Sequence, residues 1–353
     1  MSTFIPRIGS LPSGNRDAIT DIPGVRVGHA TLPPGDDGSI RTGVTAIVPP
    51  GDLFTGKPLA ACTVLNGFGK SCGLMQLAEL GCLETPIALT NTMSVGTVVT
   101  AQVREAIAAH PEIGREWSTV NPLVLECNDG FLNAIQAMAV TEAHYREAVA
   151  AASEDFAQGA VGAGRGMSCF QMKGGIGSAS RVAEGHTVGV LVLSNFGRMP
   201  QCILAGVPLG KLLLERQAAL GAKDAAAGPE KGSIIMVLAT DAPLDALQLG
   251  RLGKRCGNGL ARTGSVFGHG SGDVVIAFTT ANTLPCPEPD APVTIRRLPD
   301  KRLDALFQAA SDAAEQAVIH ALCHAEDMRG RDGNTRYALS TLLPDLEDVL
   351  RRR

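Results

Sequence analysis

The 353-residue sequence predicts a layered α+β sandwich, because strand-like and helical segments are mixed along it without a regular βαβ alternation. We expect an aliphatic core, since 45% of the residues are hydrophobic and only 4% are aromatic. A chain of this length often divides into two domains. No convincing boundary interrupts the sequence, so we expect a single domain over residues 1–353.

Five apolar runs predict strands. Two early ones cover residues 25–32 and 42–48, and turns rich in glycine and proline bound them. Three later ones cover residues 188–193, 233–240 and 273–280. Because the later runs are apolar at most positions, we expect those strands to be buried.

Apolar residues at three- and four-residue spacing predict helices over residues 72–80, 97–109, 133–152 and 303–329. Gly330 follows the last of these helices and is expected to stop it. That long final helix is amphipathic.

Composition excludes several classes of protein. The chain carries 31 basic and 35 acidic side chains, and this net charge of −4 argues against nucleic acid as a partner. The longest charge-free stretch, residues 86–103, is interrupted by polar side chains and is a poor membrane span. The start of the chain lacks the pattern of a signal peptide, and the nine cysteines are odd in number without a Cys-x-x-Cys pair. We therefore expect a cytoplasmic enzyme in a reducing compartment, with no membrane or nucleic-acid partner.

Residues 217–232 form a run of small and polar residues that ends in Gly232 and leads directly into the apolar run beginning at Ser233. A surface loop is the simple interpretation of this composition. A processing site is the alternative, because glycine lets the peptide unit before a nucleophile twist and a buried strand holds the hydroxyl still. The pattern alone leaves both interpretations open.

Two other patterns are weaker. The glycine runs at residues 162–166 and 174–177 lack the full dinucleotide fingerprint and a Gly-Lys-Ser/Thr ending, so we expect tight turns near an active site. His320, Cys323 and His324 have a spacing that could ligate a metal, but no further ligand cluster accompanies them. A partly buried helix face is the favoured interpretation, and we expect neither a metal nor another cofactor.

Eight short runs, in the same order along nearly the whole chain, resemble the P1 family of peptidases. This is the DmpA-like group of L-aminopeptidases and D-esterase/amidases, with its β-peptidyl aminopeptidase relatives. The runs are residues 21–29, 83–96, 126–133, 173–181, 232–235, 239–244, 259–264 and 270–273.

The resemblance implies a four-layer αββα sandwich of the DmpA and ornithine acetyltransferase type, similar to the N-terminal nucleophile hydrolases. It also implies self-cleavage between Gly232 and Ser233, which gives an α chain of residues 1–232 and a β chain of residues 233–353. Members of the family are commonly homotetramers of such αβ pairs.

The resemblance also implies roles for individual residues. Ser233 would form an acyl-enzyme with small peptides, amino-acid amides or esters, and its freed amino group would be the base. Ser271 and Asp273 match positions that orient the nucleophile, and Asn195 matches a donor to the oxyanion. Glu126 matches the carboxylate that receives the ammonium group of the substrate.

Three positions depart from the family pattern. Asn128, a substrate-binding candidate, stands where a tyrosine assists the oxyanion, and Lys70 stands where many members carry an acidic residue. Asp273 replaces a glutamate by a shorter carboxylate. We expect these changes to affect substrate range.

Two other functions remain as alternatives. An acyltransferase of the ornithine acetyltransferase type has a related fold, although that group uses threonine at the cleavage point and Ser233 counts against it. The other alternative is a non-catalytic glycine-loop protein that binds a nucleotide or phosphate.

Overall fold

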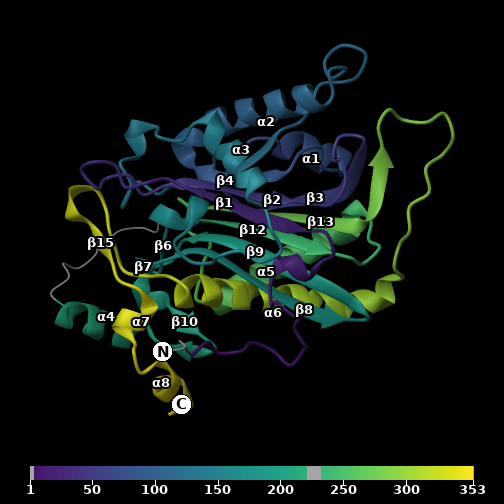
Figure 1. The fold of residues 1–353 in the computed structure, drawn as a ribbon. Helices are drawn as coiled ribbons and strands as arrows, with labels where there is room; N and C mark the ends of the chain where they lie inside the picture. Colours follow the sequence, from purple (N-terminus) through teal and green to yellow (C-terminus); the bar gives the residue numbers. More distant parts are fainter. Residues whose placement is uncertain (1–3, 221–231, 353) are drawn as a thin grey trace.

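A computed structural model describes residues 4–220 and 232–352, and two sheets packed face to face form its centre (Figure 1). Helices cover the outer face of each sheet, which produces the layer order helix, sheet, sheet, helix. The four-layer αββα sandwich expected from the sequence is therefore confirmed.

The first sheet has the strand order β1-β2-β4-β5. Strands β4 and β5 are parallel, and the other pairs are antiparallel. Its outer face packs against helices α2 and α3 through residues such as Val98 and Ala148. The elements of this half are β1 (Arg26–Thr31), β2 (Gly43–Val48), β4 (Ile87–Asn91), β5 (Leu123–Cys127), α2 (Val95–Ala109) and α3 (Glu142–Ala150).

The second sheet has the strand order β3-β13-β12-β9-β8 and packs against α5 and α6. Its central strand, β12, runs antiparallel to β9 and parallel to β13. The elements of this half are β3 (Gly56–Gly67), β8 (Gly175–Ala183), β9 (His186–Asn195), β12 (Ser233–Thr240), β13 (Gly272–Pro285), α5 (Ala246–Arg262) and α6 (Leu303–Cys323).

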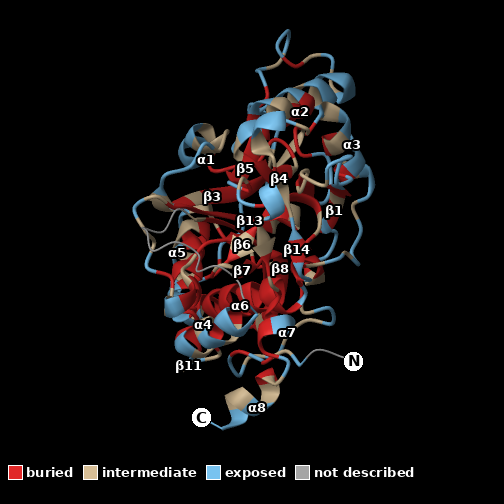
Figure 2. Ribbon diagram, turned by 90° about the vertical axis from the view of Figure 1, so that its left-hand side faces the viewer, coloured by how far each residue is buried: buried red, intermediate tan, exposed pale blue. Residues whose placement is uncertain are grey.

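Strand β12 is buried along its whole length. The strands in the middle of Figure 2 are red, the colour of buried residues. The side chains of β12 alternate between two cores, because successive residues of a strand point to opposite faces. Ile235 and Val237 pack between the sheets, whereas Met236 and Leu238 pack under α5 and α6. Both faces need apolar residues, which explains the continuous apolar run in the sequence.

Shorter elements surround the sandwich. They are α1 (Leu74–Leu80), α4 (Gly210–Ala219), α7 (Leu339–Leu342) and α8 (Leu346–Arg351), with the strand pairs β6 (Ser168–Cys169) and β7 (Met172–Lys173), β10 (Ile203–Leu204) and β11 (Val207–Pro208), and β14 (Met328–Arg329) and β15 (Thr335–Arg336). Among the residues that the structure describes, no helix combines the length and apolar character needed to span a membrane.

Two of the predicted helices are wrong at one end. The helix expected over residues 133–152 begins only at Glu142, because Met138 has a left-handed φ of 46° and Thr141 caps the later start. The helix expected over residues 303–329 ends at Cys323, and the final residues of that range form β14 instead.

The two glycine runs have different structures. Residues 162–166 form a tight 3-10 turn, as expected. Residues 175–177 instead begin the buried strand β8, so the turn expected there is wrong. At Gly177, a Cβ atom would lie 2.0 Å from the carbonyl oxygen of Ala317, so this glycine lets α6 approach the sheet. A run buried in this way is not a phosphate-binding loop.

Candidate active site

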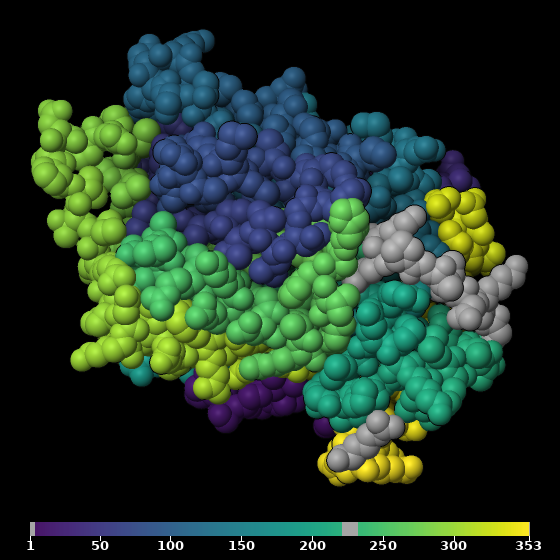
Figure 3. Space-filling view, turned by 180° about the vertical axis from the view of Figure 1, so that it is seen from behind, coloured from purple at the N-terminus to yellow at the C-terminus, as the bar shows by residue number. Residues whose placement is uncertain are grey.

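A cavity of about 740 Å³ lies where β12 and β13 begin, and Ser233 lines it together with Glu126, Asn128 and Lys70. The parallel pairing of β12 with β13 places Ser233 beside Gly272. The antiparallel pairing with β9 places Asn195, the last residue of that strand, on the other side of Ser233. In Figure 3 a green segment around residues 264–270 runs between the blue segments of the first third of the chain and the teal segment around residue 200, and all three contribute to the cavity wall.

Ser233 is buried, and its hydroxyl is held between two backbone groups. Its Oγ donates to the carbonyl oxygen of Gly232 at 2.8 Å. The same Oγ accepts the N–H of Gly272 at 3.1 Å. The hydroxyl therefore lies next to the carbonyl group that a self-cleaving serine would attack. The N–H of Gly272 is already directed at the hydroxyl oxygen.

Asn195 has a side-chain amide whose orientation is set by its neighbours. Its Oδ1 accepts the N–H of Ser168 at 2.8 Å, and its Nδ2 donates to the carbonyl oxygen of Asn128 at 3.0 Å. A primary amide carries two N–H groups, so Nδ2 has a second one besides the N–H that donates to Asn128. Of the described residues, those that line the cavity include Ser233 and Asn128 but not Asn195 itself. Asn128 contributes its main chain to this arrangement, while its exposed side chain accepts from Gly130 N at 2.9 Å.

Ser271 and Asp273 flank Gly272, the pairing partner of Ser233, and both are buried. They bond to each other, since Ser271 Oγ donates to Asp273 Oδ1 at 2.6 Å. The donor that β13 directs at Ser233 Oγ is the N–H of the residue between them, Gly272. Sequence reasoning missed Gly272. A Cβ atom at this position would lie 3.0 Å from both Gly69 Cα and Phe68 O, so a larger residue would press on the loop that contains them.

Glu126 lies near the end of β5, with only 3% of its surface exposed. Its Oε1 accepts the N–H of Lys70 at 2.9 Å, and its Oε2 accepts the hydroxyl of Thr92. Within residues 4–220 and 232–352, no lysine, arginine or histidine side chain forms an ion pair with Glu126. The carboxylate is thus held by neutral donors and can still receive a cationic group.

Two cationic side chains line the same cavity. The ammonium of Lys70 lies 4.1 Å from the centre of the Phe68 ring rather than on a carboxylate. Arg198 is the second cation, and sequence reasoning missed it because nothing in the turn after β9 indicates a binding role.

The three residues considered for a metal, His320, Cys323 and His324, belong to the end of α6 and not to the cavity wall. His320 Nδ1 lies 2.6 Å from the carbonyl oxygen of Ser178, and His324 Nδ1 lies 2.9 Å from that of His320. Burial raises the pKa of the Cys323 thiol to about 12. In the described part of the chain, no cluster of three or more histidine, cysteine or acidic side chains could hold a metal ion.

Comparison with known proteins identifies relatives of the whole chain. The chain is 39% identical to Beta-peptidyl aminopeptidase BapA of Sphingosinicella microcystinivorans over 343 residues, which is 91% of this chain and 85% of that protein. The structure is similar to the PH0078 protein from Pyrococcus horikoshii OT3, with a TM-score of 0.89, 46% identity and coverage of 98% and 97% of the two chains.

A second solved structure carries a description of its activity and fold. It is the L-aminopeptidase D-Ala-esterase/amidase from Ochrobactrum anthropi, described as a prototype for the serine aminopeptidases and a new variant among the Ntn hydrolase folds. The TM-score is 0.87 at 35% identity, over 99% of this chain and 96% of that one. Peptidase family S58 matches residues 17–336. The resemblance seen in the sequence is confirmed, and the chain belongs to peptidase family S58.

Proposed function

We propose that this aminopeptidase of family S58 cuts itself between Gly232 and Ser233 and then hydrolyses its substrates through an acyl-enzyme on Ser233. The observation that carries the proposal is the position of the Ser233 hydroxyl. Ser233 is the first residue of a buried central strand, and its hydroxyl donates to the carbonyl oxygen of Gly232. The residue also lines the cavity whose wall includes Glu126.

In the proposed cleavage, Ser233 Oγ gives up its proton and attacks the carbonyl carbon of Gly232, and the Gly272 N–H, which donates to Oγ, stabilises the negative charge that Oγ carries as the proton leaves. The C–N bond breaks, the amide nitrogen gains a proton, and an ester joins Gly232 to Ser233. Water then hydrolyses this ester. The products are an α chain that ends at Gly232 and a β chain that begins with the free amino group of Ser233.

In the proposed turnover, this amino group is the base. The pKa of an α-amino group is ordinarily about 7.7–8.0, so it is partly neutral near pH 7. It accepts the proton of the Ser233 hydroxyl as Oγ attacks the substrate carbonyl, and Asn195 Nδ2 donates to the oxyanion. The proton then passes to the leaving amine, and water releases the acyl group from Ser233.

The proposed substrates are small peptides, amino-acid amides or esters that carry a free amino group. Glu126 would bind that ammonium group, because it is a buried carboxylate on the cavity wall. The similarity to Beta-peptidyl aminopeptidase BapA supports β-amino acids as N-terminal residues to be tested first.

Assembly and location complete the proposal. We propose a homotetramer of αβ pairs, because the family resemblance implies that assembly, and exposed apolar side chains such as Met75 of α1 (89% exposed) and Leu247 of α5 (71% exposed) are candidates for the contact surface. A cytoplasmic location is proposed because all nine cysteines are free.

Intact mass spectrometry of the purified protein tests the cleavage. We expect two polypeptides that meet between residues 232 and 233, and a single uncut polypeptide for Ser233→Ala. The matched control, Ser118→Ala, changes an exposed serine and should be cut like the wild type. An uncut wild-type chain that still hydrolyses amino-acid amides would contradict the mechanism.

A further inference from the structure

We propose that Lys173 is a positioning residue, which holds the hairpin that orients the Asn195 amide toward the oxyanion. The inference rests on the proposed function, in which Asn195 donates to the substrate oxyanion. It concerns a side chain that lies outside the cavity wall and contacts no other proposed site residue directly.

Lys173 is completely buried, and its ammonium group is surrounded by main-chain carbonyl oxygens. Nζ donates to Gly164 O at 3.0 Å, Met167 O at 2.8 Å and Gly174 O at 2.6 Å. Three acceptors therefore match the three N–H groups of a protonated lysine. A methionine or leucine of similar size would leave all three carbonyl groups without this donor.

These bonds lead directly to Asn195. Met167 O is the acceptor immediately before Ser168, and the N–H of Ser168 donates to Asn195 Oδ1 at 2.8 Å. Lys173 is also the register partner of Ser168 in the β6–β7 hairpin. The ammonium group thus holds the residue before Ser168, while the lysine backbone pairs with Ser168 itself.

The turn of this hairpin is conformationally strained. Phe170 and Gln171 both have left-handed φ angles, 49° and 62°, although neither is glycine. The turn is tied to the residue after Asn195, since Phe170 N donates to Phe196 O at 2.6 Å and the two rings meet edge to face at 5.0 Å. The fold thus maintains a strained hairpin against the end of β9, where Asn195 must be oriented.

A buried ammonium without a carboxylate partner is expensive for the fold. Burial lowers the pKa of Lys173 to about 7. An apolar side chain would avoid this desolvation cost but would leave three carbonyl groups without their donor. We infer that its contribution is geometric, because a donor that moves by less than about 1 Å can lose much of its effect on an oxyanion.

A double-mutant cycle tests the role. The variants are Lys173→Met, Asn195→Ala and the double variant, with kcat and KM measured on an amino-acid amide and expressed per mature β chain. We expect Asn195→Ala to lower kcat about 100- to 1000-fold, as loss of an oxyanion donor does. Lys173→Met should lower kcat about 10- to 100-fold with KM changed less than about twofold. In the Asn195→Ala background the same change should lower kcat by less than about threefold, because its effect passes through Asn195.

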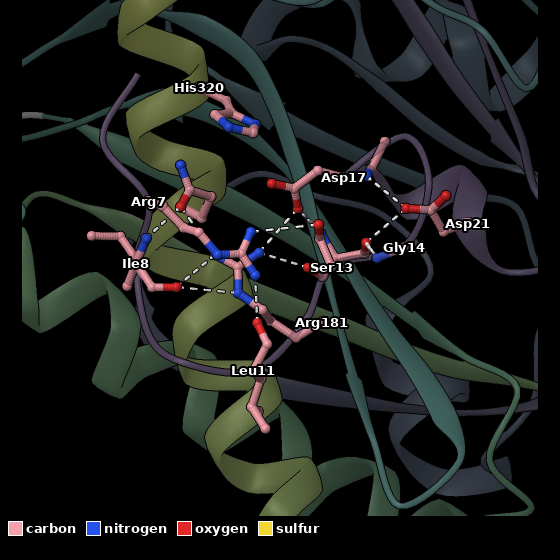
Figure 4. A network of polar contacts seen from close by, with 12 residues as sticks. Arg7, Ile8, Leu11, Ser13, Gly14, Asp17, Asp21, Arg181 and His320 are labelled. Atoms are coloured by element: carbon pink, nitrogen blue, oxygen red, sulfur yellow. Dashed lines mark hydrogen bonds and ion pairs between the residues drawn. The ribbon is translucent and has the colours of Figure 1, made fainter. Parts of the chain in front are cut away.

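Arg181 is the matched control. It is also completely buried and lies toward the other end of β8, where it donates to Ile8 O at 2.8 Å, Asp17 Oδ1 at 3.0 Å and Gln316 Oε1 at 3.0 Å (Figure 4). Arg181→Met should lower the urea midpoint of unfolding as Lys173→Met does. It should leave kcat per mature β chain within about twofold of the wild type, because the hydrogen bonds of the Arg181 side chain go to Ile8, Asp17, Ser180 and Gln316 and none of them leads to Asn195.

The outcomes separate the inference from the proposed function. Wild-type kcat in Asn195→Ala would reject the oxyanion role of Asn195, and the inference with it. Two results would overturn the inference but leave the proposed function standing. The first is a low kcat for Asn195→Ala with a wild-type kcat for Lys173→Met. The second is a kcat of the double variant that is lowered by the product of the two single losses. If Lys173→Met yields no folded protein, Lys173→Arg replaces it in the cycle. A fall in kcat that disappears in the Asn195→Ala background then supports the role, and an equal fall in both backgrounds overturns it.

Discussion

Gly272 and Ser233 are the first residues of two parallel strands, and the N–H of the glycine donates to the hydroxyl oxygen of the serine at 3.1 Å. The contact joins the proposed nucleophile to a position where the loop at Phe68 and Gly69 lies directly over the strand. Ser233, the Gly272 N–H that donates to it and the loop at Phe68 and Gly69 therefore meet at one packing contact.

Gly272→Ala tests this contact. The new Cβ atom would lie 3.0 Å from Gly69 Cα and Phe68 O, so the loop that brings Lys70 N to Glu126 must move. We expect a loss of about 1–3 kcal/mol in the free energy of unfolding and a KM raised several-fold, measured by urea unfolding and steady-state kinetics. The control Gly96→Ala places a methyl group in α2 where nothing lies within 4 Å, and it should be neutral or stabilising.

Glu126→Gln should separate self-cleavage from substrate binding. The Gln amide can donate to Thr92, whose hydroxyl can turn to accept, so the fold should tolerate the change. Loss of the charge should lower kcat/KM for free-amino amides about 10- to 100-fold, since a charged hydrogen bond is worth about 1.5–3 kcal/mol. Cleavage at residue 232 and turnover of N-acetylated amides should change less than about threefold. Equal losses on both substrates would remove the proposed role of Glu126.

Lys70→Glu tests the two cations of the cavity. Lys70 and Arg198 both line the wall around Glu126 and repel a substrate ammonium group. We expect the variant to lower KM for neutral amino-acid amides a few-fold at low ionic strength, with the effect fading above about 0.5 M salt. Lys211→Glu, at a side chain that is 93% exposed on α4, is the charge-matched control and should leave KM unchanged. An identical response of both variants would mean that the effect is not local.

The pH dependence of kcat follows from the proposed base. The amino group of Ser233 accepts a proton only when it is neutral, and its ordinary pKa is about 7.7–8.0. We expect kcat on an ester substrate to rise with pH up to about 8 and then level off. A kcat that stays constant between about pH 5.5 and 8 would exclude a group with that pKa as the base.

Acid sensitivity should depend on His29. Burial lowers its pKa from 6.5 to about 4, and the ring lies 2.9 Å from Thr45 Oγ1 and 3.0 Å from Ala157 O. The unfolded chain therefore binds the proton more readily than the folded one. The neutral His29 ring therefore makes its full contribution to the free energy of unfolding above about pH 6.5. Below that pH, this contribution falls by up to about 1.4 kcal/mol per pH unit until about pH 4.

Urea unfolding of the wild type and His29→Gln across this pH window measures that contribution. The difference between the two proteins should shrink as the pH falls. Asp129 contributes in the opposite direction, because burial raises its pKa to about 7. Its contribution cancels in the comparison, since both proteins contain it. A difference that does not vary with pH would show that His29 has an ordinary pKa.

The sequence predicts those strands and helices that carry a regular pattern of apolar residues. Residues 233–240 are apolar on both faces, and the strand has the same bounds in the structure. Strand β8 was missed because its glycines and serines conceal the strand pattern, and one of these residues, Gly177, is needed for the close approach of α6. The sequence also predicts that Ser233, Asn195 and Glu126 meet, but only through family resemblance.

Contacts made by the main chain are harder to predict. Gly272 acts through its N–H, which every residue except proline has, so no side chain indicates it. Lys173 lies in a matching run, yet its three carbonyl partners come together only when the hairpin and the 3-10 turn pack side by side. Such contacts depend on tertiary structure and not on local pattern.

The placement of β12 has a consequence for how the protein folds before and after cleavage. The strand lies between β9, which precedes Ser233 in the chain, and β13, which follows it. In the proposed mature form, this sheet therefore contains strands from two separate polypeptides, and neither polypeptide alone contains a complete hydrophobic core. The precursor folds as one molecule, at a rate that does not depend on its concentration. A denatured mature enzyme must instead reassemble from two partners, so each molecule has one efficient opportunity to fold, before it is cut.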